Sequence, residues 1–445
     1  MPAAPHPRFG TDGVRGPALT EISPEFALAL GRACSRVLGA DRLVLARDTR
    51  LSGPVLAAAF AAGAAAEGCR VDEYGVLPTP AIARVSATKN VPAAMITASH
   101  NPYHDNGIKL FAAGGRKIPD AVQVRIEDEL SRVISDPSSS GDPAPIVVRT
   151  DGMSGYVGDL LGRFGEGALS GLRLVVDSAN GAMSAIAPDA LRRLGAEVIS
   201  LSDAPDGTNI NHECGATAPR ALCEFVAQLD EVDMGFAFDG DGDRLIAVDG
   251  AGKVVDGDRL IALAAVDRFR SGRLAGGVVV ATVMANLGFH RAMEAAGIQV
   301  VTTPVGDRHV LDAMEDGGFV LGGEQSGHIV HRDMATTGDG LLAAVVTAEL
   351  VRRSGRSLAE LAGESMTSFP QVLLNVEVGR RPDDVAAVLS TEIAAEEARL
   401  GSDGRVLVRA SGTEALVRVM VEAADADEAR AAAERLADAA RRLLS

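Results

Sequence analysis

The chain has 445 residues, which exceeds what one hydrophobic core usually serves, so we expect about two to four domains. Hydrophobic residues make up 47% of the chain but aromatic residues only 3%, so Ala, Val and Leu must build the cores. The 43 basic and 60 acidic residues give a formal net charge of −17, which disfavours nucleic acid as a partner.

The first chemically suggestive stretch, residues 9–16, is rich in glycine and contains Arg15. It precedes a helix predicted from Ser23 to Leu38, whose start is signalled by Ser23 followed by Pro24. The stretch is interpreted either as an N-terminal turn or as a loop that lets Arg15 reach an anion.

A strand, a helix, a glycine and a second strand then follow one another, and this order occurs three times along the chain. It is typical of a right-handed parallel βαβ crossover. Because the copies are roughly a hundred residues or more apart, they predict three related α/β domains and not a solenoid, whose repeats are shorter. The strand pairs are residues 42–46 with a strand near Tyr74, 172–177 with 194–199, and 278–282 with 296–301.

Small polar residues follow the strand predicted at residues 91–96. The carboxyl end of a strand is where α/β folds place ligand chemistry. Ser99 is therefore the natural nucleophile or phosphate carrier, with His100 beside it and Lys109 downstream. The G-x-S-x-G elbow of an acyl hydrolase is absent. A polar turn closed by Asn-Pro is the alternative interpretation.

Three carboxylates alternate with glycine at Asp239, Asp241 and Asp243, directly after an apolar run. Their mutual repulsion requires a cation, and all-oxygen ligands indicate Mg²⁺ or a similar hard ion. The EF-hand pattern fails, because Arg244 and Gly250 stand where its turn glycine and bidentate Glu should be. Since an octahedral ion needs further ligands, a phosphate donor should lie elsewhere in the chain. An acidic surface turn is the alternative.

Residues 256–262 repeat residues 241–247 letter for letter but lack the third carboxylate. An apolar-periodic helix begins there, so Asp258 is interpreted as its N-cap. In the same way, residues 337–340 predict the start of a helix near Leu341.

Two loops of the third domain carry further polar residues. Gly306 and Asp307 follow a predicted strand, and Glu324, Ser326 and His328 lie in a glycine-rich loop after an apolar run. A carboxylate, a hydroxyl and an imidazole in one loop are good hydrogen-bond partners for sugar hydroxyls. A surface hairpin is the alternative interpretation.

Near residue 370 the pattern changes to a small α+β domain. One of its loops combines two Arg, a Ser, a Thr and a glycine, which suits a phosphate cradle without a P-loop lysine. An ordinary hairpin loop is the alternative, and no G-x-x-x-x-G-K-[ST] or G-x-G-x-x-G stretch supports nucleotide binding. The predicted strands are 372–376, 406–409 and 417–421, the helices are 382–400 and 427–444, and the cradle residues are Arg409, Ser411, Gly412, Thr413 and Arg418.

The fold class is therefore α/β, with three related α/β domains that have mixed sheets and a smaller C-terminal α+β domain. We place these domains at residues 1–150, 151–255, 256–369 and 370–445. A segment rich in Ser, Pro, Gly and Asp, residues 135–144, predicts a mobile crossing between the first two.

The cysteines and the N-terminus indicate a compartment. Cys34, Cys69, Cys214 and Cys223 show no C-x-x-C spacing, which favours free, mostly buried thiols over a metal site or disulfides. Residues 1–7 contain no apolar signal segment, and no apolar run approaches a membrane span. We therefore expect a soluble cytoplasmic protein without a membrane partner.

Four of these stretches resemble the motifs of the α-D-phosphohexomutases and occur in the same order. They are residues 97–102, 239–244, 323–328 and 409–414, and the resemblance covers essentially the whole chain. Within this superfamily, residues 9–16, residues 103–109 and Gln325 look most like the bacterial phosphoglucosamine mutases. Enzymes that act on glucose or mannose phosphates usually carry Met in place of that Gln.

The resemblance implies an isomerase with four domains around a central cleft, phosphorylated on Ser99 at rest. The phosphoserine would complete the shell of a Mg²⁺ ion held by Asp239, Asp241 and Asp243. The implied reaction converts glucosamine 6-phosphate into glucosamine 1-phosphate through glucosamine 1,6-bisphosphate, which serves the synthesis of cell-wall amino sugars. The partner would be a small sugar phosphate, and a homodimer is a possible assembly.

The resemblance also implies roles for the remaining residues. Mg²⁺, Arg15, Lys109 and Arg244 would neutralise the transferring phosphoryl group, and Lys109 and His100 are both candidates for a general base. The residues that would hold the sugar and its second phosphate are Gly306, Asp307, Glu324, Ser326, His328, Arg409, Ser411, Gly412, Thr413 and Arg418. The alternatives are a phosphoglucomutase or phosphomannomutase and, more remotely, a non-catalytic sugar-phosphate-binding protein.

Overall fold

The computed structural model describes residues 7–136, 138, 141–379, 384–410 and 416–444. By internal packing the chain divides into two compact units, Met1–Met284 with Ile298–Gly363, and Ala285–Gly297 with Glu364–Ser445. The described residues form four sheets of seven, five, four and three strands. The first three sheets belong to the larger unit and the fourth belongs to the smaller one.

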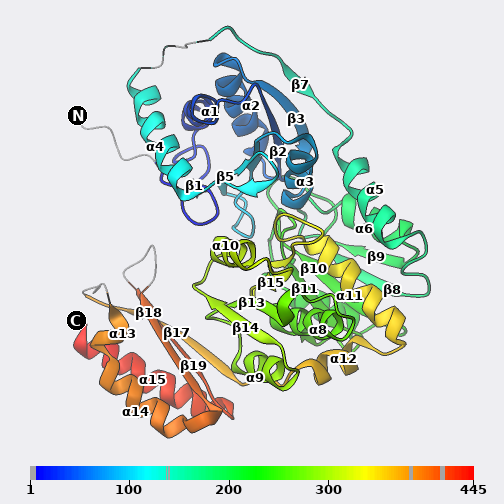
Figure 1. Cartoon of the computed structure of the whole chain (residues 1–445), viewed down its shortest axis with the longest axis vertical. Helices are drawn as coiled ribbons and strands as arrows, with labels where there is room; N and C mark the ends of the chain where they lie inside the picture. The colour runs from blue at the N-terminus through cyan, green and yellow to red at the C-terminus, as the bar shows by residue number, and fades with distance from the viewer. Residues whose placement is uncertain (1–6, 137, 139–140, 380–383, 411–415, 445) are drawn as a thin grey trace. The chain divides into compact units, whose positions relative to one another are not determined.

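The first sheet is mixed and has the order β1-β5-β4-β2-β3-β7, with β6 paired to β5. Its strands are β1 Val14–Pro17, β2 Arg42–Arg47, β3 Arg70–Val76, β4 Ala93–Ile96, β5 Asp105–Ala112, β6 Arg116–Lys117 and β7 Ile146–Val148, and its helices are α1 Pro24–Leu38, α2 Gly53–Ala66, α3 Thr79–Lys89 and α4 Asp120–Ser135. The parallel pairing of β2 with β3 confirms the predicted crossover (Figure 1). Of the predicted mobile crossing, residues 137, 139 and 140 lie outside the described residues.

Helix α1 begins and ends where the local sequence predicts. The side chain of Ser23 accepts a hydrogen bond from the backbone N–H of Phe26 at 3.2 Å, and Pro24 occupies the first helical turn. Gly39 ends the helix in the left-handed conformation, with φ of 58°. The predicted helix from Ser23 to Leu38 is therefore confirmed.

Two glycines set the distance between α1 and α2. A Cβ atom added to Gly31 would lie 2.2 Å from the carbonyl oxygen of Phe60, and one added to Gly63 would lie 2.0 Å from that of Leu28. Both distances are shorter than any real Cβ contact, so larger side chains at these positions would force the helices apart. The close packing supports the apolar core beneath β2 and β4.

The second and third sheets repeat the parallel crossover. Parallel pairs join β8 to β9 and β13 to β14, as predicted. The second sheet has β8 Arg173–Asp177, β9 Glu197–Leu201, β10 Met234–Phe238, β11 Leu245–Asp249 and β12 Val254–Val255, with α5 Gly152–Phe164, α6 Ile186–Arg193 and α7 Arg220–Val226. The third has β13 Val278–Thr282, β14 Gln299–Thr303, β15 Leu321–Gly323 and β16 Ile329–His331. The helices near it in sequence are α8 Gly257–Arg270, α10 Asp307–Gly317, α11 Gly340–Ser354 and α12 Leu358–Ser365, with a short 3₁₀ turn at Ala275–Gly277. Helix α9 Leu287–Ala295 lies between β13 and β14 in sequence but belongs to the smaller unit.

The predicted N-cap of α8, Asp258, is wrong by two residues. Asp256, with extended backbone, accepts a hydrogen bond from the N–H of Arg259 at 3.1 Å and is the N-cap. Asp258 lies inside the first turn and is buried. A cap residue must precede the first helical residue with non-helical backbone, and of the two aspartates only Asp256 does so.

The helix predicted to start near Leu341 is α11, and its N-cap is the buried Asp339. Its Oδ1 accepts hydrogen bonds from the N–H of Leu342 at 2.9 Å and from the hydroxyl of Tyr156 at 2.6 Å. Burial raises the pKa of this carboxyl from 3.8 to about 6. A folded-state pKa above the unfolded value means that the folded state loses stability as the pH rises from about 4 through 6.

We expect Asp339→Asn to be more stable than the native chain above pH 7, by roughly 2–3 kcal/mol, because the buried charge is removed. Asparagine keeps the single oxygen that accepts both hydrogen bonds and is an equally good cap. Thermal midpoints measured from pH 5 to 8 should show the gain shrinking as the pH falls. A gain that is constant with pH would contradict this origin.

The smaller unit contains a three-stranded antiparallel sheet of order β17-β19-β18. The predicted strands are confirmed, but the helix predicted at 382–400 is wrong as a single element, because Leu389 leaves helical geometry and separates two helices. Residues 380–383 lie outside the described residues. The elements are β17 Gln371–Glu377, β18 Arg405–Ala410, β19 Leu416–Glu422, α13 Val385–Val388, α14 Ser390–Leu400, α15 Ala426–Leu443 and a 3₁₀ turn at Gly401–Asp403.

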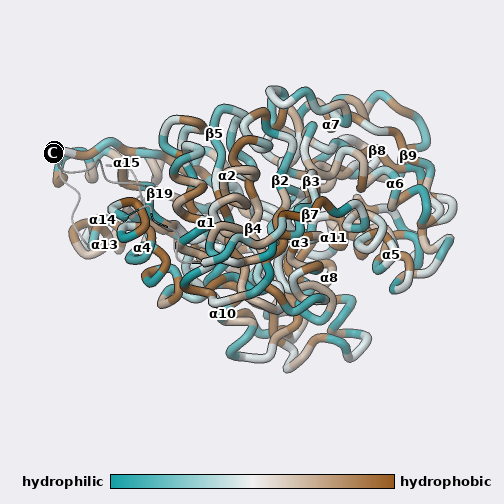
Figure 2. The backbone as a smooth tube through the Cα atoms, turned by 90° about the horizontal axis from the view of Figure 1, so that it is seen from above, coloured by the Kyte–Doolittle hydropathy of each residue, from teal (hydrophilic) through white to brown (hydrophobic). Residues whose placement is uncertain are grey.

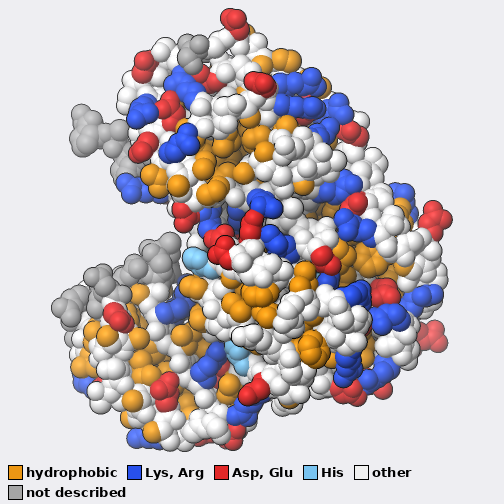
Figure 3. Space-filling view, viewed as in Figure 1, with side chains coloured by type: hydrophobic (Ala, Val, Ile, Leu, Met, Phe, Trp, Pro, Cys, Tyr) orange, Lys and Arg blue, Asp and Glu red, His pale blue; other side chains and the backbone are white. Residues whose placement is uncertain are grey.

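Apolar residues recur along the whole chain instead of gathering in one long segment (Figure 2). None of the described helices combines the length and the apolar character needed to cross a membrane. All four cysteines are free, and Cys34, Cys69 and Cys214 are buried, as predicted. Acidic and basic side chains are interspersed on the face displayed in Figure 3.

Candidate active site

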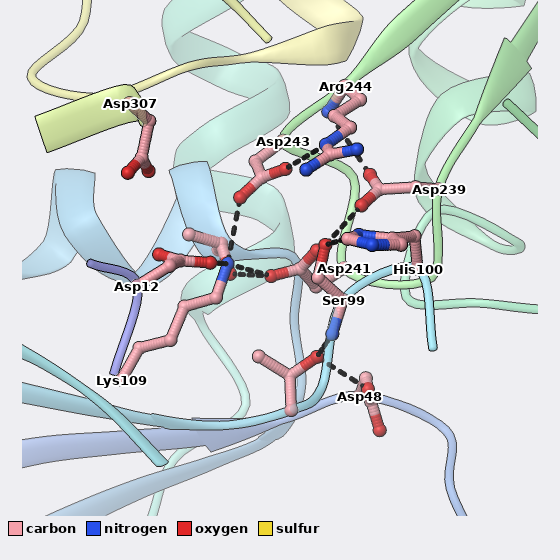
Figure 4. Close-up of polar contacts among 12 residues, drawn as sticks. Asp12, Asp48, Ser99, His100, Lys109, Asp239, Asp241, Asp243, Arg244 and Asp307 are labelled. Atoms are coloured by element: carbon pink, nitrogen blue, oxygen red, sulfur yellow. Dashed lines mark hydrogen bonds and ion pairs between the residues drawn. The ribbon is translucent and has the colours of Figure 1, made fainter. Parts of the chain in front are cut away.

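Ser99 lies directly beyond the end of β4, and its side chain points at the aspartate loop (Figure 4). Its hydroxyl donates a hydrogen bond to Oδ2 of Asp239 at 2.6 Å, across 140 residues of sequence. Nδ1 of His100 lies 3.4 Å from the same hydroxyl oxygen. The backbone of Ser99 has φ of 52°, which is uncommon for a residue other than glycine. The structure therefore joins the two stretches on which the sequence interpretation depends.

Asp239, Asp241 and Asp243 lie in the tight loop between β10 and β11, where Gly242 adopts φ of 73°. All three are buried, and one carboxylate oxygen from each lies within 4.8 Å of the others. Among the described atoms, Oδ1 of Asp241 and Oδ1 of Asp243 have no hydrogen-bond partner. Burial and repulsion by the other two carboxylates raise the pKa of Asp239 well above its usual value. Carboxylate oxygens without hydrogen bonds, in a crowded, acidic, all-oxygen cluster, fit a hard divalent cation.

Lys109, on β5, supplies a positive charge beside this cluster. Its ammonium group lies 2.7 Å from Asp241, 2.8 Å from Asp243 and 2.9 Å from Asp12. Burial alone would lower the pKa of Lys109, but attraction by the three carboxylates outweighs it and raises the pKa well above the usual value. In the same way, burial opposes ionisation of Asp241, yet the charge of Lys109 lowers the pKa of that carboxyl. Lys109 is therefore a cation at neutral pH.

Arg15 and Arg244 add two more cations, and His100 stays neutral between them. Arg15 pairs with Asp12, and the backbone N–H of Arg244 donates to Oδ1 of Asp239 at 3.1 Å. Burial, followed by repulsion from Arg244 and Arg15, lowers the pKa of His100 to about 3. An uncharged imidazole beside the Ser99 hydroxyl can accept a hydrogen bond there.

The predicted sugar-binding loop is hydrogen-bonded to the strand that follows the aspartates. The N–H of Leu245, on β11, donates to the carbonyl of Gly327 at 2.9 Å. Glu324 accepts a hydrogen bond from the N–H of Gly306 at 3.1 Å, so the two loops of the third domain are joined. Ser326 is exposed at the turn of the β15–β16 hairpin.

His328 and Asp307 approach each other beside these loops. Nε2 of His328 lies 3.7 Å from Oδ2 of Asp307, and neither ring nitrogen of this buried histidine has a hydrogen-bond partner among the described atoms. Asp307 is paired with Lys117 of β6, which also contacts Asp12 at 2.5 Å. A chain of alternating charges thus connects Asp307 to Lys109 through Lys117 and Asp12.

In the smaller unit, Arg409 and Arg418 are directly opposite each other on β18 and β19. Burial and repulsion by Arg418 lower the pKa of Arg409. The Nε atom of Arg418 is buried and has no hydrogen-bond partner among the described atoms. Two like charges opposite each other are destabilising unless an anion joins them. The predicted cradle residues Ser411, Gly412 and Thr413 lie outside the described residues.

Sequence reasoning missed several residues that touch this site. Thr79, at the start of α3, holds Asp241 twice, through its hydroxyl at 2.5 Å and through its N–H to the carbonyl at 2.8 Å. Asp12 lies inside the glycine-rich stretch at 9–16, where an aspartate is typical of a turn and gives no sign of a functional role. Lys117 belongs to no motif. Arg50 and Asn211, which contact the backbone around Ser99, were also missed.

The chain was compared with known families and proteins. Models of the phosphoglucomutase/phosphomannomutase family match residues 6–135 as alpha/beta/alpha domain I, 155–252 as domain II, 256–369 as domain III and 373–439 as the C-terminal domain. A phosphoglucosamine mutase of Saccharopolyspora erythraea is 50% identical over 438 residues, which covers 97% of this chain and 98% of the relative.

Solved structures share the fold. A phosphoglucomutase/phosphomannomutase family protein from Burkholderia thailandensis is 25% identical with a TM-score of 0.80, covering 98% of this chain and 99% of its own. The N-acetylphosphoglucosamine mutase of Aspergillus fumigatus, solved with GlcNAc-6P and magnesium, is 21% identical with a TM-score of 0.73, covering 99% of this chain and 96% of its own.

Proposed function

Because the chain belongs to the phosphoglucomutase/phosphomannomutase family, we propose that it is an isomerase that interconverts glucosamine 6-phosphate and glucosamine 1-phosphate. The observation that carries the chemistry is the contact between the Ser99 hydroxyl and the buried aspartate loop, 2.6 Å at Asp239. The choice of glucosamine is supported by full-length relatives at about half identity that are phosphoglucosamine mutases. The free, buried thiols support a reducing compartment such as the cytoplasm.

Ser99 is proposed to carry the phosphoryl group. In the first half of the cycle its phosphorus–oxygen bond breaks as the free hydroxyl of the sugar monophosphate attacks, which gives glucosamine 1,6-bisphosphate. The proton of that hydroxyl leaves to a neighbouring base or to water. His100 lies beside Ser99, but its pKa of about 3 makes the imidazole a weak base for this proton. In the second half the other phosphate returns to Ser99 and restores the phosphoenzyme.

The aspartate loop would hold Mg²⁺ through Asp239, Asp241 and Asp243, together with the phosphate on Ser99. When bound, this ion would supply positive charge to the transferring phosphoryl oxygens. Phosphoryl transfer depends mainly on positioning and charge neutralisation. Lys109, Arg15 and Arg244 supply fixed positive charge around the aspartate loop in any case.

The remaining candidate residues are proposed to bind the sugar phosphate. Glu324, Ser326 and His328, with the adjoining loop at Gly306 and Asp307, offer donors and acceptors for ring hydroxyls. In the smaller unit, the opposed guanidinium groups of Arg409 and Arg418 suit the phosphate that is not transferred. Ser411, Gly412 and Thr413 are proposed to join them on the grounds of sequence alone.

An assay on three sugar phosphates tests this function. Glucosamine, glucose and mannose 1-phosphates are supplied separately with Mg²⁺ and a trace of the matching 1,6-bisphosphate. We expect kcat/KM for the glucosamine compound to exceed the others by about tenfold or more, and turnover to stop after chelation and return with Mg²⁺. A preference for glucose or mannose phosphate would instead identify a phosphoglucomutase or phosphomannomutase. Tight binding without isomerisation would exclude an enzyme.

A further inference from the structure

Arg50, in the turn between β2 and α2, is a fully buried arginine that is saturated with hydrogen bonds. A guanidinium group has five N–H donors, and those of Arg50 have protein acceptors that leave none for a substrate. The acceptors are Asp48 Oδ2 at 2.9 Å, the carbonyls of Ser99 at 2.8 Å, Asn101 at 2.7 Å and Asp105 at 3.0 Å, and the carbonyl of Pro102. Arg50 therefore organises the backbone of the loop that carries Ser99.

Asn211, from the second domain, reaches two of the same carbonyls. Its Nδ2 donates to the carbonyl of Ser99 at 2.9 Å and to that of Asn101 at 3.1 Å. The backbone N–H of Asn211 is itself bound to the carbonyl of Ala179 at 2.9 Å, which anchors it at the end of β8. The loop is thus held by a side chain from each of two domains.

The backbone conformation of Ser99, which Arg50 and Asn211 hold, is strained. A non-glycine residue with φ near 50° costs about 1–3 kcal/mol and persists only where its surroundings determine it. The N–H of Ser99 donates to the hydroxyl of Thr97 at 2.8 Å, and that hydroxyl donates to Asp48 at 2.6 Å, which returns the network to Arg50. This network holds the loop in the conformation in which the Ser99 hydroxyl donates to Asp239.

The second domain packs closely against the backbone carbonyl of Ser99. A Cβ atom added to Gly240, inside the aspartate loop, would lie 2.6 Å from the carbonyl oxygen of Ser99 and 2.8 Å from Nδ2 of Asn211. The distance between the phosphoryl carrier and the aspartates is therefore set where the two domains meet. Misplacement of reacting groups by about 1 Å can slow a reaction about 10²-fold.

We propose that Arg50 and Asn211 are positioning residues for phosphoryl transfer at Ser99, Arg50 by shaping the loop and Asn211 by fixing it to the domain of the aspartates. Neither touches a reacting atom, and both act through the backbone carbonyls of Ser99 and Asn101. The inference rests on the proposed function only in that Ser99 carries a phosphoryl group.

The test measures phosphorylation of Ser99 directly. Dephosphorylated enzyme is mixed with Mg²⁺ and glucose 1,6-bisphosphate, and the mass of the intact protein is followed with time. In this step the phosphorus leaves one sugar oxygen and bonds to Oγ of Ser99, while the serine proton passes to the released sugar oxygen. The products are phosphoserine and a glucose monophosphate.

We expect Asn211→Ala to phosphorylate about 10–100-fold more slowly, with the half-saturating bisphosphate concentration changed by less than about twofold. The thermal midpoint should stay within about 3 °C, since a single hydrogen-bonding side chain is removed. The control is Asn209→Ala, an asparagine whose side chain, among the described atoms, bonds within the same loop to residues 204 and 206. This control should phosphorylate at the native rate.

Arg50→Lys is a second variant, which keeps the charge but cannot reproduce the planar set of donors. It should be slower than Asn211→Ala, and Asn211→Ala alone decides the outcome if the lysine variant does not fold. A rate within about twofold of native for Asn211→Ala, or equal slowing in Asn209→Ala, would overturn the proposal. If native enzyme phosphorylates Ser99 but does not isomerise glucosamine phosphates, the substrate assignment fails and the positioning role stands.

Discussion

Ser99→Ala is expected to lower kcat by about 10⁴-fold or more, because the atom that carries the phosphoryl group is removed. The fold should be retained, since among the described residues the Ser99 hydroxyl makes only the hydrogen bond to Asp239 and the longer contact with His100. Turnover in the glucosamine phosphate assay and the mass of the intact protein are the two measurements. The native protein should carry one phosphate and the variant none.

The matched control is Ser271→Ala, which removes an exposed hydroxyl at the end of α8. This hydroxyl donates to helix carbonyls and accepts a hydrogen bond from Nε of Arg273 at 2.9 Å, far from the aspartate loop in sequence. It should keep native turnover and native phosphorylation. Two results would contradict the role of Ser99: native protein that is fully active without phosphoserine, or an alanine variant that retains more than about 1% of turnover.

Lys109→Met should have the largest effect on stability. The buried ammonium group neutralises Asp12, Asp241 and Asp243 together, and its loss leaves three carboxylates without their shared cation. Removing one partner of a buried charge cluster typically costs about 3–5 kcal/mol. In metal-free buffer we expect the thermal midpoint to fall by roughly 5 °C or more, and kcat to fall by about 10²-fold or more.

Added Mg²⁺ should raise the thermal midpoint of Lys109→Met more than that of the native chain. Without the lysine, only Arg15 and Arg244 among the described side chains still offset the aspartates, so a divalent ion should be bound more tightly. A ligand stabilises the state that binds it more tightly. Lys253→Met, at an exposed position, is the control and should behave as native in both buffers. An unchanged midpoint in metal-free buffer would show that the carboxylates do not depend on Lys109.

Local sequence was sufficient for most of the helices and strands, and for the motifs that contain their own chemistry, although it did not predict the break at Leu389. The parallel crossovers, the cap of α1 and the alternating aspartates are all encoded within a few neighbouring residues. An ion with three carboxylates needs another ligand, which predicted a phosphate donor elsewhere in the chain, and the family resemblance implied that this donor is Ser99. The structure brings these residues together, and their catalytic roles stay a prediction.

Long-range contacts explain what sequence reasoning missed. Asn211 meets Ser99 across 112 residues and belongs to no motif that would distinguish it from Asn209. Lys117 meets Asp307 across 190 residues. The error at α8 has a different cause, because Asp256 and Asp258 are both good capping residues and only backbone geometry chooses between them.

The bonds of Thr79 and Lys109 to Asp241 have a consequence for transplanting the acidic loop. Both partners come from the first domain, whereas the aspartates come from the second. A synthetic hairpin spanning residues 234–249 would carry every aspartate yet lack the groups that orient them. Such a peptide should bind Mg²⁺ no better than any acidic turn, so ion selectivity is a property of the assembled domains and cannot be grafted with the motif.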